Sequence, residues 1–299
     1  MLEVKNITKK FGNFIAVEDE SFKIDDGKIL GLIGQNGAGK STTFKMILNF
    51  LKPDQGEIFW NGQKISDPTL DEIGFLPEER GIDVNLTAEQ QILFFAELHG
   101  LKRKEVQGKI DDWFTRFDVR GKKTDKIKKF SKGNQQKIQI IATLIHNPKL
   151  LILDEPFSGL DPVNTSLFLN EIKIAAKNGA SVIFSSHDMG NVSEISDDIL
   201  MLIKGKAVLS GDINQVRSSF GRTQLYLESP ISNDELRKIN GVLDISNHEL
   251  GRIIRLADEK TGEKIFKLVT KNGFIPAFSL QPPTLDEIFR IKIDNFTNE

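Results

Sequence analysis

The sequence predicts an α/β fold, a mixed sheet with a helical lobe, followed by a small α+β domain at the C-terminal end. Short apolar runs such as Leu30–Ile33 and Leu150–Leu153 are typical of buried parallel strands. Between Thr87 and about His146 the pattern is instead helical. Beyond residue 221, short strands and helices alternate again, which indicates a second, smaller domain.

The composition is that of a globular chain without an obvious nucleic-acid or disulfide chemistry. Its 299 residues suffice for one large domain or two ordinary ones. The net charge of −2 gives no general reason to expect nucleic acid, and the absence of cysteine excludes disulfides and thiol chemistry. We find no signal peptide and no apolar run as long as a membrane span, so we expect a cytoplasmic protein, and any membrane link would come through a partner.

The first elements read as antiparallel strands. Residues 2–24 alternate loosely between apolar and polar positions, which predicts half-buried strands. Farther along, Asn61-Gly62 lies between two strand-like runs and predicts a tight hairpin. Ile73–Leu76 reads as a short strand that ends at Pro77.

The most informative motif directly follows the strand Leu30–Ile33. Residues 34–41 match G-x-x-x-x-G-K-[ST], and an apolar helix face comes next. Backbone N–H groups of such a loop, together with the helix N-terminus, form a cradle for phosphates. We predict that Lys40 binds the β- and γ-phosphates of ATP and that the Ser41 hydroxyl ligates Mg²⁺. The alternative, a glycine-rich turn with an unrelated lysine, is disfavoured by this context. The nucleotide-binding residues predicted here are Gly34, Gln35, Asn36, Gly37, Ala38, Gly39, Lys40, Ser41 and Thr42.

The central helical segment shows a helix start and a basic run. Thr87 with Gln90 resembles a capping box. The lysines between Lys122 and Lys129 are predicted to form a solvated face, because no aromatic residues are interleaved among them.

Two carboxylates end the buried strand Leu150–Leu153. At the C-terminal edge of a parallel sheet, Asp154 can hold Mg²⁺ beside Ser41. Glu155 is placed to polarise a water for attack on the γ-phosphate. The alternative, acids that merely end a strand, is weak given the phosphate loop upstream.

The C-terminal region predicts a βαββαβ order, typical of a split βαβ domain. A last helix follows Pro282-Pro283, and we find no catalytic constellation here. The elements expected are strand 224–227, helix 234–239, strands 242–246 and 252–256, helix 263–271 and strand 275–280.

Together, these motifs make residues 1–220 resemble the ATP-binding subunit of an ABC transporter. The resemblance implies that Phe11 stacks on adenine and that His187 hydrogen-bonds the γ-phosphate. Glu78 stands where the family has a glutamine that touches Mg²⁺ or the attacking water, and we take it as a nucleotide and metal contact.

Residues 130–134 occupy the place of the family's signature, Leu-Ser-Gly-Gly-Gln. The resemblance implies that Ser131 and Gly133, at a helix start, contact a γ-phosphate bound on the opposite subunit. Asp161 is implied to cross the dimer interface. Phe130, Lys132 and Asn134 depart from the pattern, and Lys132 either adds a charge near the phosphate or lies in solvent.

The resemblance further implies an ATPase core (1–220) with a helical lobe (about 77–146) and an accessory domain (221–299). Two subunits, identical or paralogous, would enclose two ATP molecules. The lobe, especially Arg80–Leu101, would dock on a separate transmembrane permease subunit at the inner face of the cell membrane. The C-terminal domain resembles those of bacterial exporter-type subunits, which favours export. No nucleic acid is expected as a partner.

Two other functions remain open from the sequence. One is a soluble ABC-type ATPase that acts on ribosomes or DNA, although such proteins usually carry two ATPase cores or a long coiled-coil insertion. The other is a nucleotide-gated module without hydrolysis. Lys40, Asp154, Glu155 and His187 argue against the second, whereas Glu78 and Lys132 leave it open.

Overall fold

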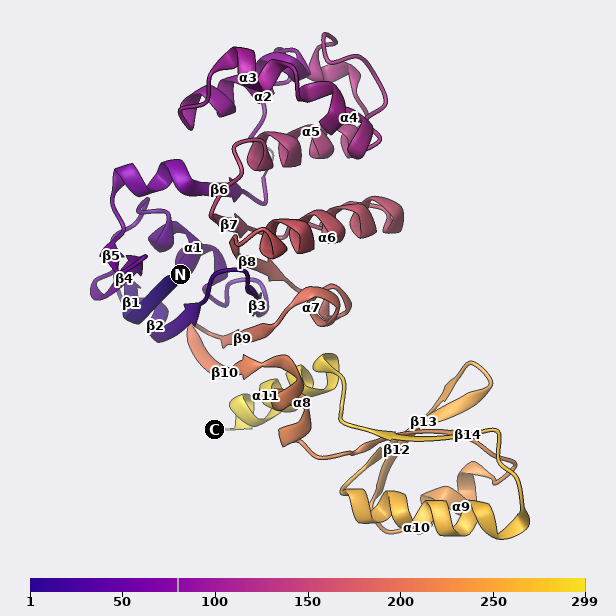
Figure 1. Ribbon diagram of the computed structural model, residues 1–299. Helices are drawn as coiled ribbons and strands as arrows, with labels where there is room; N and C mark the ends of the chain where they lie inside the picture. The colour runs from indigo at the N-terminus through magenta and orange to yellow at the C-terminus, as the bar shows by residue number, and fades with distance from the viewer. Residues whose placement is uncertain (80, 299) are drawn as a thin grey trace. The chain divides into compact units, whose positions relative to one another are not determined.

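The computed structural model describes residues 1–79 and 81–298. The chain divides into two compact units, Met1–Ser210 and Gly211–Glu299 (Figure 1). This division lies within strand β10 (Lys206–Asp212), whereas the boundary predicted after residue 220 lies at the end of helix α8 (Ile213–Ser219). None of the helices in the described ranges combines the length and apolar character that crossing a bilayer requires.

A single mixed sheet organises the first unit, in the order β5-β4-β1-β2-β10-β9-β3-β8-β7-β6. Strands β1, β2, β4 and β5 pair antiparallel, and β9, β3, β8, β7 and β6 pair parallel. This confirms the predicted mixed α/β sheet. Its strands are β1 (Leu2–Phe11), β2 (Phe14–Ile24), β3 (Ile29–Ile33), β4 (Gln55–Trp60), β5 (Gln63–Lys64), β6 (Ile73–Leu76), β7 (Leu150–Leu153), β8 (Ser181–Ser186), β9 (Asp198–Ile203) and β10.

Burial explains the two halves of this sheet. Strands β3, β7 and β8 are buried at every position, as expected for parallel strands covered on both faces. The antiparallel strands β1 and β2 mix buried and exposed positions. Because β3, β7 and β8 are parallel neighbours, the loops after their C-terminal ends meet at one edge of the sheet.

The helices of the first unit form two groups. One group lies next to the sheet. The other, α2 to α5, forms the helical lobe beside it (Figure 1). The capping box predicted at Thr87 is present, since the side chains and backbones of Thr87 and Gln90 hydrogen-bond reciprocally. The sheet group is α1 (Lys40–Ile47), η1 (Asp67–Glu72), α6 (Pro162–Lys177) and α7 (Met189–Ile195); the lobe contains α2 (Ala88–Leu98), α3 (Arg103–Gln107), α4 (Ile110–Arg116), η2 (Ile127–Lys129) and α5 (Lys132–Leu144).

The second unit has the predicted βαββαβ order. Its sheet is antiparallel, in the order β12-β13-β11-β14, and α9 and α10 lie on one face of it (Figure 1). A separate apolar core, with Leu225, Ile254 and Ile265 fully buried, holds this sheet to its helices. The elements are β11 (Gln224–Glu228), α9 (Asn233–Arg237), β12 (Val242–His248), β13 (Gly251–Leu256), α10 (Glu259–Val269), η3 (Thr270–Asn272), β14 (Ala277–Gln281) and α11 (Leu285–Asn298).

Candidate functional site

The glycine-rich loop between β3 and α1 is curled around the side chain of Lys40. Lys40 Nζ donates to the carbonyl of Gly34 at 2.7 Å and to that of Gln35 at 3.3 Å. Gly37 and Gly39 have φ angles of 81° and 112°, a region that favours glycine. A Cβ on Gly39 would also lie 2.7 Å from the Ala16 carbonyl oxygen, so this position requires glycine for space as well. The loop therefore places backbone N–H groups at the start of α1.

Asp154, at the end of β7, is held by a serine on the neighbouring strand. Ser185 Oγ donates to Asp154 Oδ1 at 2.6 Å and accepts the backbone N–H of Glu155 at 2.8 Å. Asp154 is only 7% exposed and Ser185 is fully buried. One hydroxyl thus fixes both acidic residues that follow β7.

Glu155 lies between a histidine and the loop lysine. Its Oε2 is 2.9 Å from His187 Nδ1, and its Oε1 is 3.7 Å from Lys40 Nζ. The Glu155 side chain is 9% exposed, whereas that of His187 is 69% exposed. With φ of 46°, Glu155 has the left-handed backbone that non-glycine residues rarely adopt, and such strain is common at functional sites.

These residues line one cavity of about 340 Å³, a volume within the range of small-molecule sites. Gly34 and Gln35 are outside its lining and hold Lys40 through their carbonyls, and His187 reaches the site through Glu155. The cavity is lined by Phe11, Phe14, Ala16, Asn36, Gly37, Ala38, Gly39, Lys40, Ser41, Thr42, Glu78, Asp154 and Glu155.

Three lining or supporting residues were not predicted from the sequence. Phe14 pairs with Phe11 across the β1–β2 hairpin, and both rings are at least half exposed. Ala16 lies against Gly39. Ser185 belongs to the run Ser181–Ser186, which reads only as a buried strand. Phe14 could have been predicted from the register of the β1–β2 hairpin, which pairs it with Phe11. Nothing in the sequence indicates that Ser185 contacts Asp154.

Ser131, Gly133 and Asp161 lie outside this cavity, at helix starts. Ser131 is the N-cap of α5 and accepts the Asn134 N–H at 3.3 Å. Asp161 is the N-cap of α6 and accepts from the backbone N–H and the side-chain amide of Asn164. Both caps are exposed.

Two of the three departures from the signature, Lys132 and Asn134, have different surroundings. Lys132 is exposed. The Asn134 side-chain amide exchanges two 3.3 Å hydrogen bonds with the backbone of Arg120. Asn134 therefore fastens the loop after α4 to α5.

The oxygen groups in the cavity suit a magnesium ion. Ser41, Asp154 and Glu78 supply a hydroxyl and two carboxylates to the same cavity. The described residues include no compact group of three metal-binding His, Cys, Asp or Glu side chains. Mg²⁺ takes one or two carboxylates from a protein and completes its shell with water and phosphate oxygens, and the three groups in the cavity fit this requirement.

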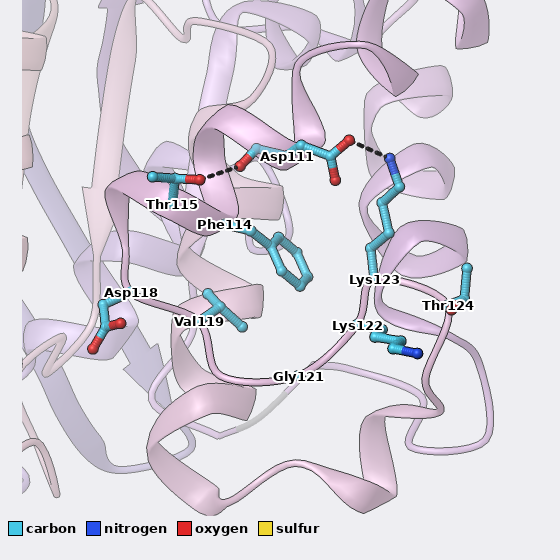
Figure 2. A pocket seen from close by; sticks show the side chains of 9 residues that line it. All are labelled: Asp111, Phe114, Thr115, Asp118, Val119, Gly121, Lys122, Lys123 and Thr124. Atoms are coloured by element: carbon cyan, nitrogen blue, oxygen red, sulfur yellow. Dashed lines mark hydrogen bonds and ion pairs between the residues drawn. The ribbon is translucent and has the colours of Figure 1, made fainter.

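A second cavity, inside the helical lobe, involves none of the predicted site residues. Figure 2 shows it between α4 and the segment 118–124, with the side chains of Phe114 and Val119 toward its interior. Lys123 Nζ donates to Asp111 Oδ2 at 2.7 Å beside it, so these two charges are already paired. The predicted phosphate-binding loop lines the first cavity, and we place the nucleotide chemistry there.

Comparison with protein families gives two matches along the chain. Residues 17–158 match the ABC transporter family, and residues 211–293 match the C-terminal domain of DrrA1-3-like ATP-binding proteins. The uncharacterized ABC transporter ATP-binding protein YhaQ of Bacillus subtilis is 39% identical over 98% of both chains. The chain belongs to the ATP-binding subunits of ABC transporters.

Other members of this ABC family extend the comparison. The linearmycin resistance ATP-binding protein LnrL of Bacillus subtilis is 30% identical over 97% of both chains. A solved ATP-binding subunit of an ABC transporter, 30% identical, superposes with a TM-score of 0.69 over 74% of this chain and 93% of its own. A dimeric post-hydrolysis state of the cassette MJ0796, bound to ADP and Pi, is 25% identical, with a TM-score of 0.62 over 71% of this chain and 99% of its own.

Proposed function

We propose that this ABC subunit binds MgATP in the first cavity, hydrolyses it, and thereby powers a separate transmembrane subunit, for export. The observation that supports hydrolysis most directly is the position of Glu155. Its carboxylate lies 3.7 Å from Lys40 and 2.9 Å from His187, at the edge of the phosphate-binding loop. A base must be next to the site of attack, and this arrangement provides one.

Each residue of the site has a separate role in the proposed hydrolysis. Loop N–H groups and Lys40 bind the β- and γ-phosphates, and Phe11 offers a face for adenine. Glu155 accepts the proton of a water whose oxygen attacks the γ-phosphorus, the bond to the β–γ bridging oxygen breaks, and ADP and phosphate form. His187 holds Glu155 in place. Mg²⁺, held by Ser41, Asp154 and Glu78, would neutralise charge on the phosphates.

We further propose that the active form is a dimer of this chain or a pair with a paralogue. Ser131, Gly133 and Asp161 lie outside the cavity of their own chain. Ser131 and Gly133 are at the start of α5, where N–H groups favour an anion. A second subunit would present them to the γ-phosphate, and the dimeric MJ0796 cassette supports this arrangement.

The helical lobe is the proposed dock for the permease, at the cytoplasmic face of the membrane. Val84, Phe94 and Leu98 are 41%, 50% and 59% exposed, and the last two lie one turn apart on α2. Arg80, where the predicted docking segment begins, lies outside the described residues. Export is supported by the DrrA1-3-like C-terminal domain and by the resistance function in the name of LnrL.

Glu155→Gln tests the hydrolytic assignment. Because it removes the base and keeps the size of the side chain, we expect hydrolysis to fall by about 10²–10⁴-fold. In light scattering after gel filtration, the variant should form ATP-dependent dimers.

Glu194→Gln is the matched control, since Glu194 is exposed and pairs with Lys173. It should hydrolyse ATP like the wild type. Wild-type turnover by Glu155→Gln would show that Glu155 is not the base.

A further inference from the structure

A second glutamate, Glu20 on β2, is buried behind the first turn of α1. It is 0% exposed. Its Oε2 accepts the Thr43 hydroxyl at 2.7 Å, and its Oε1 has no hydrogen-bond partner among the described residues. Thr43, equally buried, donates its backbone N–H to the Gly39 carbonyl at 2.9 Å. Hydrogen bonds therefore connect Glu20 to the last glycine of the phosphate loop.

Burial makes the charged form of Glu20 unfavourable. A buried carboxylate with only one hydrogen bond leaves a charged oxygen unsatisfied. Burial raises the pKa of Glu20 to about 7, and the hydrogen bond from Thr43 opposes this rise. Near neutral pH, both the acid and the carboxylate are therefore populated.

The elements around Glu20 offer it no counter-ion. Within residues 1–79 and 81–298 no ion pair includes Glu20, and β8, which packs near β2, carries no ionisable side chain. The charged groups on β1, β2, α1 and β10 have other partners or lie in solvent. They are Lys5 with Glu3, Lys9 with Asp54, Lys206 with Glu18, Lys23 with Asp25, Asp19 with Asn6, Lys40 with Glu155, Asp212 with the backbone N–H groups of Asn214 and Gln215, and the exposed Lys10 and Lys45.

We propose that Glu20 is a positioning residue for the phosphate loop: as a neutral acid it anchors the first turn of α1 through Thr43, and as a carboxylate it opposes the anionic nucleotide bound at that turn. The proton leaves to solvent, and the charge stays in the core. This inference rests on the proposed function, because it needs ATP at the loop. Thr43 is three residues after Lys40, about 4.5 Å along the helix axis, so the charge would lie within one helical turn of the lysine that binds the phosphates.

The test is the pH dependence of nucleotide affinity. We would titrate the full chain, with Mg²⁺, with a fluorescent N-methylanthraniloyl ATP at about pH 6 and about pH 8. From about pH 6 to about pH 8, the wild type gains one buried negative charge near the triphosphate. We expect its Kd for the nucleotide to rise about threefold or more beyond any rise seen in Glu20→Gln. Glu18→Gln, on the same strand but exposed and paired with Lys206, should respond like the wild type.

Thr43→Val is a second variant, in case Glu20→Gln does not fold. Removing the hydroxyl that lowers the pKa of Glu20 should move the midpoint of the affinity change to higher pH. A structural role alone would not move this midpoint.

The outcomes separate the two proposals. Equal pH responses of wild type and Glu20→Gln, or an unmoved midpoint in Thr43→Val, would overturn the role of Glu20 and leave the ATPase intact. A wild-type chain that binds no nucleotide at either pH would overturn both.

Discussion

Ser185 shows how one side chain can organise a catalytic edge. Its hydroxyl donates to Asp154 Oδ1 and accepts the Glu155 N–H. In Ser185→Ala, both groups lose their partner in a buried site, so we expect a loss of about 1–3 kcal/mol of unfolding free energy. Hydrolysis should fall by about 10- to 100-fold, because Glu155 is no longer fixed. Urea unfolding and steady-state ATPase assays measure the two effects.

Ser181→Ala is the control on the same strand. Ser181 is also fully buried, but its hydroxyl donates to the Asp25 carbonyl, away from the cavity. It should cost stability and leave turnover unchanged. Equal turnover in Ser185→Ala and the wild type would show that the serine has no part in positioning Glu155.

His146 makes stability depend on pH. It stacks on His99 with ring centroids 3.8 Å apart, and both its ring nitrogens are buried. Burial, followed by repulsion from His99, lowers the pKa of His146 from 6.5 to about 4. Between these values the unfolded chain binds the proton more tightly. The contribution of His146 to the free energy of unfolding is therefore fully present above pH 6.5 and is lost as the pH falls toward 4.

His146→Phe keeps a stacked ring and removes the titration. Between about pH 7 and about pH 5, the variant should lose roughly 2 kcal/mol less unfolding free energy than the wild type. Urea unfolding at both pH values measures this difference. His248→Phe, at an exposed histidine, should keep the wild-type slope. A variant slope as steep as the wild type would contradict the role of His146.

The sequence predicts the motif residues of the candidate site better than it predicts the residues that hold them in place. Short contiguous motifs, the phosphate loop and the end of a buried strand, identify Lys40, Asp154 and Glu155. Ser185 and Glu20 do not, because their partners are on other elements and only the strand register and helix packing bring them together. The roles of the predicted site residues remain predictions that the variants above test.

At the scale of elements, the side-chain amide of Gln136 joins the helical lobe to the loop that follows Glu155. Gln136 Nε2, on α5, donates to the carbonyls of Pro156 at 3.2 Å and Ser158 at 3.3 Å. These carbonyls lie in the loop between Glu155 and Asp161. Because Ser131 is the N-cap of α5, this amide links the helix that carries the signature residues to the loop that follows Glu155.

Gln136→Met keeps the length of the side chain and removes both donors. We expect ATP turnover to fall by about tenfold, because the loop after Glu155 is no longer held, while ATP affinity stays unchanged. ATPase assays and nucleotide titration separate the two effects.

Gln135→Met is the matched control, since the Gln135 amide donates to the Ile127 and Phe130 carbonyls at the start of α5. It should retain most of the turnover. Equal loss in both variants would mean that the signature helix as a whole, rather than the link to Pro156 and Ser158, sets the rate.

Elements with a strong local signal were predicted correctly. The order of strands and helices in the second unit follows from alternation and turn residues in the sequence. In the helical lobe, the sequence predicted helix starts at Thr87 and Ser131, which are the N-caps of α2 and α5, whereas the short helix α3 was not predicted. Short helices there depend on packing, which a single sequence does not show.

At the scale of the whole molecule, the chain combines the candidate nucleotide cavity with two exposed sets of residues outside it. Ser131 and Asp161 are exposed at helix starts outside their own cavity. Phe94 and Leu98 expose apolar surface on α2. We propose that a second ATPase subunit covers the first pair and a permease the second.

The most direct test of this proposal is co-purification from solubilised membranes of the source organism, with tagged Glu155→Gln protein and ATP. We expect one integral membrane protein in a fixed ratio to the tagged chain. Adding Phe94→Glu should release it and leave the ATP-dependent dimer intact. Recovery of soluble proteins alone, while ATP-dependent dimers still form, would contradict the transporter and retain the ATPase.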